Sequence, residues 1–383
     1  MPVTLTKAEA RKRLIKRSDM VAEKVAFIDC KMPGSHLKEN YALIGPGVTQ
    51  STKQLVNLAE PHGFSLGIAA MPAGITNNLH VHYTAETFMV FTGTWKFRWG
   101  DHGRDGEITG GPGDLVSVPT WIFRGFTNVG DTDGWIFTAL GEDKTGGILW
   151  HPAILKVAAD HGLFLTRDNM MVDTALGEKR PGDADLLTPL TQEQIDAMRH
   201  YSVDERRKWV VARADRQYSA QALLDSVLPC HAAELAPAVG FGMTQDRDQR
   251  SPIPYPHGFS IDWIRMQPGN QIGAHAVADK QVLIVLQGAM AVDLNTGADL
   301  LTEQVAAQEV FSAPANVVRA YRSVGDKPLE MAVISAGDHK TRISWSEEIV
   351  MAAGKAGVAL DHNGYIADLD LLPLSVKQAH GRA

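Results

Sequence analysis

The sequence predicts an all-β fold that is built twice along the chain. Its 383 residues exceed the roughly 100–200 residues of a single domain, so two domains of similar size are expected. Short runs of β-forming residues alternate with Gly, Pro, Asn and Asp in both halves, which is typical of sandwiches and barrels rather than of alternating strands and helices. An internal repeat supports the same division, because self-similarity marks repeated structural units.

The repeat has a constant offset of 195 residues, since residues 61–65 (PHGFS) recur as residues 256–260. We therefore expect a gene duplication, with one domain over 1–195 and a second over 196–383. The histidines of PHGFS, His62 and His257, occur in both halves and are expected in a turn or an interface rather than in catalysis. The same offset joins His36 to His231, Gly45 to Gly240, Gly93 to Gly288, Pro119 to Pro314, Arg124 to Arg319 and Trp150 to Trp345.

The expected strands are short, and the expected helices lie at the edges of the repeats. Residues 87–91 and 282–286 are continuous apolar runs closed by a Gly, as in strands buried on both faces. Apolar and basic residues alternate over 95–99, which predicts a strand with one buried face. Charged stretches predict short helices around 8–17 and 203–211, and a further helix is expected over 191–198.

Composition excludes several classes of protein. Lys and Arg number 37 against 44 Asp and Glu, so the formal charge of −7 argues against a surface for nucleic acid. Basic residues interrupt the N-terminal segment before a signal peptide could form, and no window reaches the roughly 18 apolar residues of a membrane span. The two cysteines, Cys30 and Cys230, are too few for a disulfide framework. A cytoplasmic protein is expected.

The residues that carry chemistry are two histidines and a glutamate in the first half. His80 and His82 lie two residues apart, so on a strand both side chains point to the same face. Glu86 follows four residues later and can reach the same point from the next strand. Two imidazoles and a carboxylate form a ligand set for Fe(II), Mn(II), Ni(II) or Zn(II).

This pattern resembles the cupin superfamily, whose motifs are G(x)5HxH(x)3-4E(x)6G and G(x)5PxG(x)2H(x)3N. The resemblance implies tandem cupin barrels, which are double-stranded β-helices or jelly rolls, with short flanking helices. Residues 119–123 (PTWIF) also resemble the PxWxW stretch of gentisate-type bicupins, and the chain is loosely similar to gentisate- and quercetin-type dioxygenases. The matching positions are Gly74, His80, His82, Glu86 and Gly93 in the first motif and Gly113, Pro119 and Asn128 in the second.

Two positions depart from the cupin pattern. Trp121 stands where Gly is usual, and Arg124 replaces the histidine that is the usual fourth ligand. Arg124 cannot bind a metal, because its guanidinium stays protonated and has no free lone pair. The centre would then be an open His, His, Glu site, with Arg124 beside it for an anionic group of the substrate. Alternatively, Arg124 pairs with Glu86 and no metal binds.

The second half has lost the ligand set. His275 remains, but Val277 and Gln281 replace the second histidine and the glutamate, and Arg319 again holds the fourth place. We expect one divalent metal per chain, with Fe(II) favoured over Mn, Ni or Zn. The second barrel is expected to be structural or to hold a metal-free pocket.

The resemblance implies a metal-dependent dioxygenase acting on a small phenolic, enolic or diketone-type substrate that carries an anionic group. One alternative is a lyase or isomerase in which the metal is a Lewis acid and Tyr83 or a histidine is the base. Another is a non-catalytic binding or storage bicupin. Expected partners are the substrate, dioxygen and further copies of the chain in a homo-oligomer. Arg124 and Tyr83 are the candidate catalytic residues, and the expected pocket residues are Asn78, Phe88, Trp95, Phe97 and Trp121.

Overall fold

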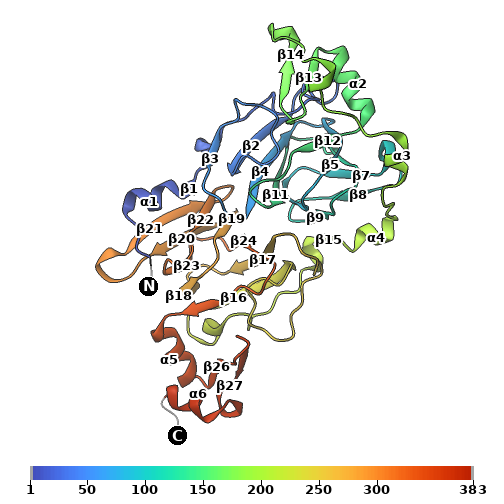
Figure 1. Ribbon diagram of the computed structural model, residues 1–383. Helices are drawn as coiled ribbons and strands as arrows, with labels where there is room; N and C mark the ends of the chain where they lie inside the picture. The colour runs from blue at the N-terminus through green and yellow to red at the C-terminus, as the bar shows by residue number, and fades with distance from the viewer. Residues whose placement is uncertain (1–2, 381–383) are drawn as a thin grey trace. The chain divides into compact units, whose positions relative to one another are not determined.

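Residues 3–380 are described by a computed structural model, and they divide into two compact units, each a β-barrel (Figure 1). The first unit, here called the first barrel, runs from Met20 to Asp215. The second barrel comprises the residues up to Asp19 together with those from Arg216 onward. Every helix in the described part of the chain is too short or too polar to span a membrane.

The first barrel consists of two antiparallel sheets with an apolar core between them. One sheet has the order β15-β9-β6-β11-β4-β2-β3, in which only β2 and β3 pair in parallel, and the other has the order β12-β5-β10-β7-β8. Phe88, Phe97, Phe126 and Ile136 come from both sheets and lie in one buried cluster. The strands are β2 (Glu39–Ile44), β3 (Val56–Leu58), β4 (Phe64–Met71), β5 (Thr76–His82), β6 (Glu86–Thr92), β7 (Trp95–Trp99), β8 (Gly106–Gly110), β9 (Leu115–Val118), β10 (Arg124–Asn128), β11 (Gly134–Gly141), β12 (Ile148–Trp150) and β15 (Val210–Val211), with β13 (Leu163–Leu165) and β14 (Met171–Asp173) in a separate hairpin.

The second barrel repeats this plan. Its sheets have the orders β1-β22-β19-β24-β17-β16 and β21-β20-β23-β18-β25, and the apolar faces of both form one core. The strands are β1 (Leu14–Ile15), β16 (Ala233–Val239), β17 (Phe259–Met266), β18 (Gln271–Val277), β19 (Gln281–Gln287), β20 (Ala289–Leu294), β21 (Leu301–Ala306), β22 (Val310–Ala313), β23 (Arg319–Val324), β24 (Leu329–Ala336) and β25 (Ile343–Trp345), with β26 (Val358–Leu360) and β27 (Ile366–Asp368) in a hairpin.

Short helices flank the strands, and those expected from the charged stretches are shorter than the stretches themselves. The helix expected around 8–17 ends at Lys12 because the chain then enters β1. Its start is set by a capping box in which Thr6 and Glu9 satisfy each other's backbone N–H groups. The helices are α1 (Lys7–Lys12), α2 (Pro152–Asp160), α3 (Gln192–Asp196), α4 (Val203–Arg207), α5 (Glu347–Lys355) and α6 (Leu374–Ala379).

The two units differ from the expected ranges 1–195 and 196–383 in the segments that precede each repeat. Strand β1 pairs with β22 of the second barrel, and β15 pairs with β9 of the first. Ile15 and Val210 are related by the offset of 195, so the same edge of both barrels receives the same kind of strand. β1 precedes the first repeat but joins the second barrel, and β15 precedes the second repeat but joins the first barrel. The boundaries of the two units therefore differ from those expected from the repeat.

The histidines of the repeated PHGFS segment lie at equivalent turns. The backbone N–H groups of His62 and Gly63 donate to Asp143, at 2.7 and 3.0 Å. In the second barrel His257 donates in the same way to Asp338, at 2.8 Å. These contacts fit the expected role in a turn.

A bulge interrupts the strand that carries the histidines. Arg124 of β10 pairs with His80, but two residues further along, Phe126 pairs with Asn77 rather than with Asn78. The extra residue on β5 shifts the alternation of side chains between the two faces of the sheet. Asn77 therefore lies on the same side as His80 and His82. The second barrel has the same bulge, where Ile272 takes the place of Asn77.

Candidate metal centre

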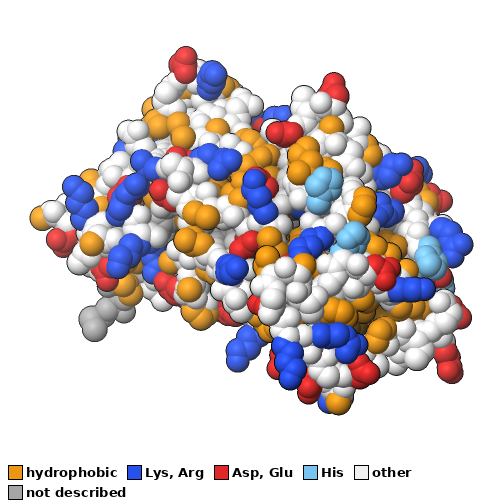
Figure 2. Space-filling model, turned by 90° about the horizontal axis from the view of Figure 1, so that it is seen from above, with side chains coloured by type: hydrophobic (Ala, Val, Ile, Leu, Met, Phe, Trp, Pro, Cys, Tyr) orange, Lys and Arg blue, Asp and Glu red, His pale blue; other side chains and the backbone are white. Residues whose placement is uncertain are grey.

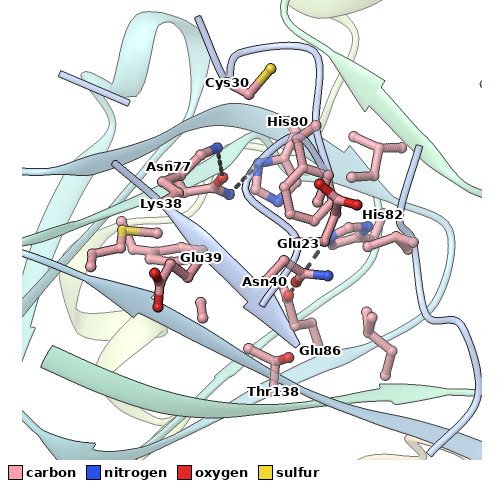
Figure 3. A pocket seen from close by; sticks show the side chains of 18 of the residues that line it. Glu23, Cys30, Lys38, Glu39, Asn40, Asn77, His80, His82, Glu86 and Thr138 are labelled. Carbon is pink, nitrogen blue, oxygen red and sulfur yellow. Dashed lines mark hydrogen bonds and ion pairs between the residues drawn. The ribbon is translucent and has the colours of Figure 1, made fainter. Parts of the chain in front are cut away.

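The histidine and glutamate side chains singled out in the sequence meet at one point inside the first barrel. His80 and His82 project from β5, and Glu86 is the first residue of β6. One ligand atom from each lies within 4.8 Å of the others, and all three side chains are buried. Figure 3 shows the three converging on a common cavity.

Both imidazoles are held in the neutral form that can bind a metal. His80 Nδ1 lies 2.7 Å from the carbonyl oxygen of Asn78, which can only accept, so Nδ1 carries the hydrogen and the lone pair is on Nε2. Burial lowers the pKa of His80 well below its usual value, and the neighbouring His82 lowers it further. Burial also lowers the pKa of His82, although Glu86 opposes the shift.

The Glu86 carboxylate faces His82 on one side and Arg124 on the other. Its Oε1 lies 3.5 Å from His82 Nε2, and its Oε2 lies 3.7 Å from Arg124 Nε. The distance from Oε2 is too long for a hydrogen bond, and among residues 3–380 this oxygen has no hydrogen-bond partner. Two lone-pair nitrogens and a carboxylate with an unused oxygen are a donor set that fits a divalent cation.

Arg124 is buried against this donor set. Its Nη2 donates to the Pro119 carbonyl at 3.0 Å, and burial lowers the pKa of the guanidinium to about 10, so it remains charged at neutral pH. The side chain does not belong to the set that lines the cavity. Arg124 pairs with His80 across β10 and β5 and lies 3.7 Å from Glu86, where its charge can orient the carboxylate.

The cavity beside the three side chains has a volume of about 50 Å³. A space of this size holds a few water molecules or a small organic ligand. Its wall is apolar on some sides and polar on others. The lining residues are Glu23, Lys24, Ala26, Phe27, Cys30, Lys38, Glu39, Asn40, Val48, Ala69, Met71, Asn77, His80, His82, Glu86, Phe126, Thr138, Leu140 and Ile148.

Most of the aromatic residues expected at a pocket pack elsewhere. Phe88, Trp95 and Phe97 are buried in the core between the sheets and are absent from the cavity lining. Tyr83 and Trp121 pack edge to face with their ring centres 5.4 Å apart, and Trp121 is 49% exposed. Two aromatic rings do line the cavity beside the candidate ligands. They belong to Phe126 on β10 and to Phe27 in the segment before β2.

The structure brings Asn77, rather than Asn78, to the cavity. Asn78 donates from its side chain to Asp29 at 3.0 Å and to Ser35 at 2.7 Å. A regular strand would place residues 78, 80 and 82 on one face, and the bulge in β5 replaces Asn78 with Asn77. Lys38 also lines the cavity, although it lies outside any motif of the sequence.

A second group of side chains, Asp101, His102 and His151, also has ligand atoms within 4.8 Å of one another. His151 caps α2, because its Nδ1 accepts the backbone N–H of Ala153 at 3.2 Å. A neutral ring whose Nδ1 accepts carries its hydrogen on Nε2, and this atom lies 2.9 Å from Asp101 Oδ1. The group is thus hydrogen-bonded as a helix cap and leaves His151 no lone pair for a metal.

The second barrel keeps the position of the centre without its ligands. His275 Nδ1 bonds to the Gly273 carbonyl at 2.8 Å, as His80 does to Asn78. Gln281 bonds instead to Ser335 at 2.8 Å, and Arg319 donates to the Pro314 carbonyl at 2.8 Å. Within the described residues, no cluster of three metal-ligating side chains forms around His275.

We expect His275 to make stability depend on pH. Burial lowers its pKa to about 3, with a further contribution from Arg319, whereas an unfolded histidine titrates near 6.5. Above about pH 6.5 the ring is neutral in both the folded and the unfolded chain, so its contribution to stability is fully present. As the pH falls from 6.5 towards 3, the unfolding free energy decreases by up to about 1.4 kcal/mol per pH unit, because the unfolded chain binds a proton that the buried ring does not. Between pH 7.5 and 5 the unfolding free energy of wild type should fall about 2 kcal/mol more than that of His275→Gln.

Denaturant unfolding at the two pH values checks this, with His161→Gln at an exposed position as the matched control. Equal losses in wild type and His275→Gln would show that the buried ring does not control the pH dependence.

No family model matches the sequence, and no curated protein matches it. Solved structures do resemble it. The oxalate decarboxylase of Lactobacillus farciminis in its formate complex has a TM-score of 0.56 at 14% identity and covers 98% of this chain and 97% of its own. The oxalate decarboxylase of Bacillus subtilis at pH 4.6 has a TM-score of 0.55 at 12% identity, over 96% of this chain and 82% of its own. Vicilin from Corylus avellana has a TM-score of 0.51 at 11% identity, over 87% of each chain.

At such low identity these likenesses show the fold alone. The fold is the bicupin fold, so the sequence prediction of tandem all-β cupin barrels is confirmed. The neighbours include oxalate decarboxylases and a vicilin, and their shared architecture leaves the activity to be argued from the site.

Proposed function

We propose that the first barrel is a metal-dependent enzyme whose divalent cation is held by His80, His82 and Glu86. The observation that carries the proposal is the convergence of three buried donor atoms, all within 4.8 Å of one another, beside a cavity. Burying two imidazoles and a carboxylate for packing alone would be costly, since each polar group loses its water. A bound cation compensates that loss and uses the unpartnered oxygen of Glu86.

The residues around the centre prepare it for a small ligand. The Asn78 carbonyl fixes the ring of His80, and the charge of Arg124, 3.7 Å away, attracts the carboxylate of Glu86. Because Arg124 is not a ligand, a three-residue centre leaves coordination positions open on the cavity side. When bound, the metal supplies Lewis acidity and, if it is Fe(II), the capacity to react with dioxygen.

We favour a dioxygenase that cleaves a small enolic or diketone-type substrate bound through its oxygen atoms. The open positions leave room for both a chelating substrate and dioxygen. The cavity of about 50 Å³ favours the smallest members of this class over phenolic rings.

A second candidate is a metal-dependent lyase acting on a small acid. The same small volume favours it, and oxalate decarboxylases are among the solved structures that resemble this chain in fold. A redox-inert metal would suffice for such a reaction.

Turnover assays separate the candidates. Protein loaded with Fe(II), Mn(II) or Zn(II) is incubated with acetylacetone, oxaloacetate and oxalate, while dioxygen uptake and carbon dioxide release are recorded. We expect substrate-dependent dioxygen uptake with Fe(II) and none with Zn(II). Carbon dioxide release without net dioxygen uptake would replace the dioxygenase with the lyase. Metal binding without turnover of any substrate would point to a non-catalytic bicupin.

A further inference from the structure

A buried lysine shares the cavity with the candidate ligands. The side chain of Lys38 is 6% exposed, and its Nζ lies against Asp29 Oδ1 and 2.6 Å from Asn77 Oδ1. Nζ also lies 5.2 Å from the ring centre of Phe27, a cation–π distance. An ammonium group has three N–H donors, and within residues 3–380 two of them have hydrogen-bond partners.

The lysine lies beside one of the candidate ligands and across the cavity from the other two. Asn77, which accepts from Lys38 Nζ, has its Nδ2 3.4 Å from His80 Nδ1. In Figure 3, Lys38, Asn77 and His80 lie together, and His82 and Glu86 lie across the space. A small molecule bound to a metal at the candidate ligands would therefore extend towards the ammonium group.

The second barrel shows that the fold does not require this lysine. There Asp225 takes the place of Asp29, because it accepts the backbone N–H of Gly273 at 2.7 Å as Asp29 accepts that of Asn78 at 3.2 Å. The partner of Asp225 is His231, at 2.8 Å. The offset of 195 relates Lys38 to Ala233 and Asn77 to Ile272, so both polar groups are missing where the ligands are missing.

The charges of the buried groups call for an anionic ligand. Lys38 is balanced by Asp29, Arg124 by Glu86, and Lys24 by Glu39. Glu23, the remaining charged residue of the lining, contributes one negative charge. A divalent cation bound to neutral imidazoles would therefore leave one uncompensated positive charge at the cavity, which is unfavourable without an anion.

We infer that Lys38 anchors a carboxylate of the substrate, whose other end chelates the metal. The inference rests on the proposed metal centre and narrows its substrate to a short bifunctional acid. The Lys38 ammonium contributes the charge, and Asp29 and Asn77 fix its position. Arg124, which contacts Glu86 but does not line the cavity, is thus a positioning residue rather than the anchor.

Two acids that differ by one carboxylate test the inference. Glycolate chelates a metal through its hydroxyl and carboxylate, and tartronate has the same chelating group with one further carboxylate. Co(II)-loaded protein is titrated with each acid, and the visible absorption of the cobalt reports binding. Since one charge-assisted hydrogen bond is worth about 1.5–3 kcal/mol, wild type should bind tartronate roughly ten- to a hundredfold more tightly than glycolate.

Lys38→Met should reduce the preference for tartronate roughly ten- to a hundredfold, to the ratio set by the metal alone, while glycolate affinity and cobalt content stay unchanged. Because this variant leaves Asp29 buried without its partner, the double variant Asp29→Asn with Lys38→Met provides the same test without an unpaired charge. Lys24→Met is the matched control, since this lysine also lines the cavity but its side chain is 71% exposed. It should keep the wild-type preference.

The possible outcomes distinguish the anchoring role of Lys38 from the metal centre itself. Bound cobalt with equal affinities for the two acids in wild type overturns the role of Lys38 alone. The same conclusion follows if the double variant keeps the preference, or if Lys24→Met loses it as fully as Lys38→Met. Failure of wild type to bind cobalt contradicts the metal centre and removes the anchor with it.

Discussion

Glu86→Gln should weaken metal binding by roughly a hundredfold or more, because a direct ligand contributes more than the roughly 10–100-fold attributed to groups outside the coordination sphere. The amide keeps the shape of the side chain but loses the negative charge. It also leaves the buried Arg124 without its balancing carboxylate, 3.7 Å away. Breaking a buried pair in this way is expected to lower the unfolding free energy by about 3 kcal/mol.

The fold itself should survive, because the second barrel combines Gln281 with Arg319 at the equivalent positions. Competition with a metal chelator gives the affinity, and circular dichroism with denaturant unfolding gives the fold and its stability. Glu39→Gln is the matched control, since Glu39 lines the same cavity with a partly exposed side chain paired to Lys24. Unchanged affinity in Glu86→Gln with a normal spectrum would reduce Glu86 to a partner of Arg124.

The fold and the convergence of His80, His82 and Glu86 could be predicted because both follow from residue spacings along the chain. The repeat at 195 residues specifies two similar barrels, and strand periodicity places His80 and His82 on one face. The expected strand over 95–99 is β7, with Trp95, Phe97 and Trp99 buried. For these features, the spacing of residues along the chain was enough to predict the structure.

The polar wall of the cavity could not be predicted, because it depends on features that have no local pattern. The bulge in β5 brings Asn77 inward in place of Asn78, and it is visible only from the pairing with β10. Lys38 reaches the cavity from the segment just before β2, where the sequence resembles an ordinary solvated stretch.

Aromatic residues near a motif also gave little guidance to the cavity. Phe88 follows Glu86 by two residues on β6, yet its ring packs against Phe97 and Phe126 at 5.1 and 4.9 Å. Alternation along a strand decides the face of the sheet but not the depth at which a side chain meets the core. The aromatic rings expected to line a substrate pocket therefore pack in the apolar core instead. On the face shown in Figure 2, basic side chains are interspersed with acidic ones, so the charge of that face gives no further guidance.

The replacement of both His80 and His82 by Ala should remove the metal altogether. A single remaining carboxylate beside the Arg124 guanidinium is a poor site for a divalent cation, because imidazole supplies the ligands that such metals favour. The matched control is His275→Ala, which removes the corresponding histidine of the second barrel and should leave the metal content unchanged. Circular dichroism of each variant establishes that the barrels still fold.

Elemental analysis of protein purified without added metal and then loaded with one cation tests the metal centre most directly. We expect about one metal ion per chain in wild type and in His275→Ala, and background levels in the His80→Ala, His82→Ala variant, because the three donors converge in the first barrel. Metal retained by the double variant, or a wild-type content near two per chain or near zero, would contradict a single centre at His80, His82 and Glu86.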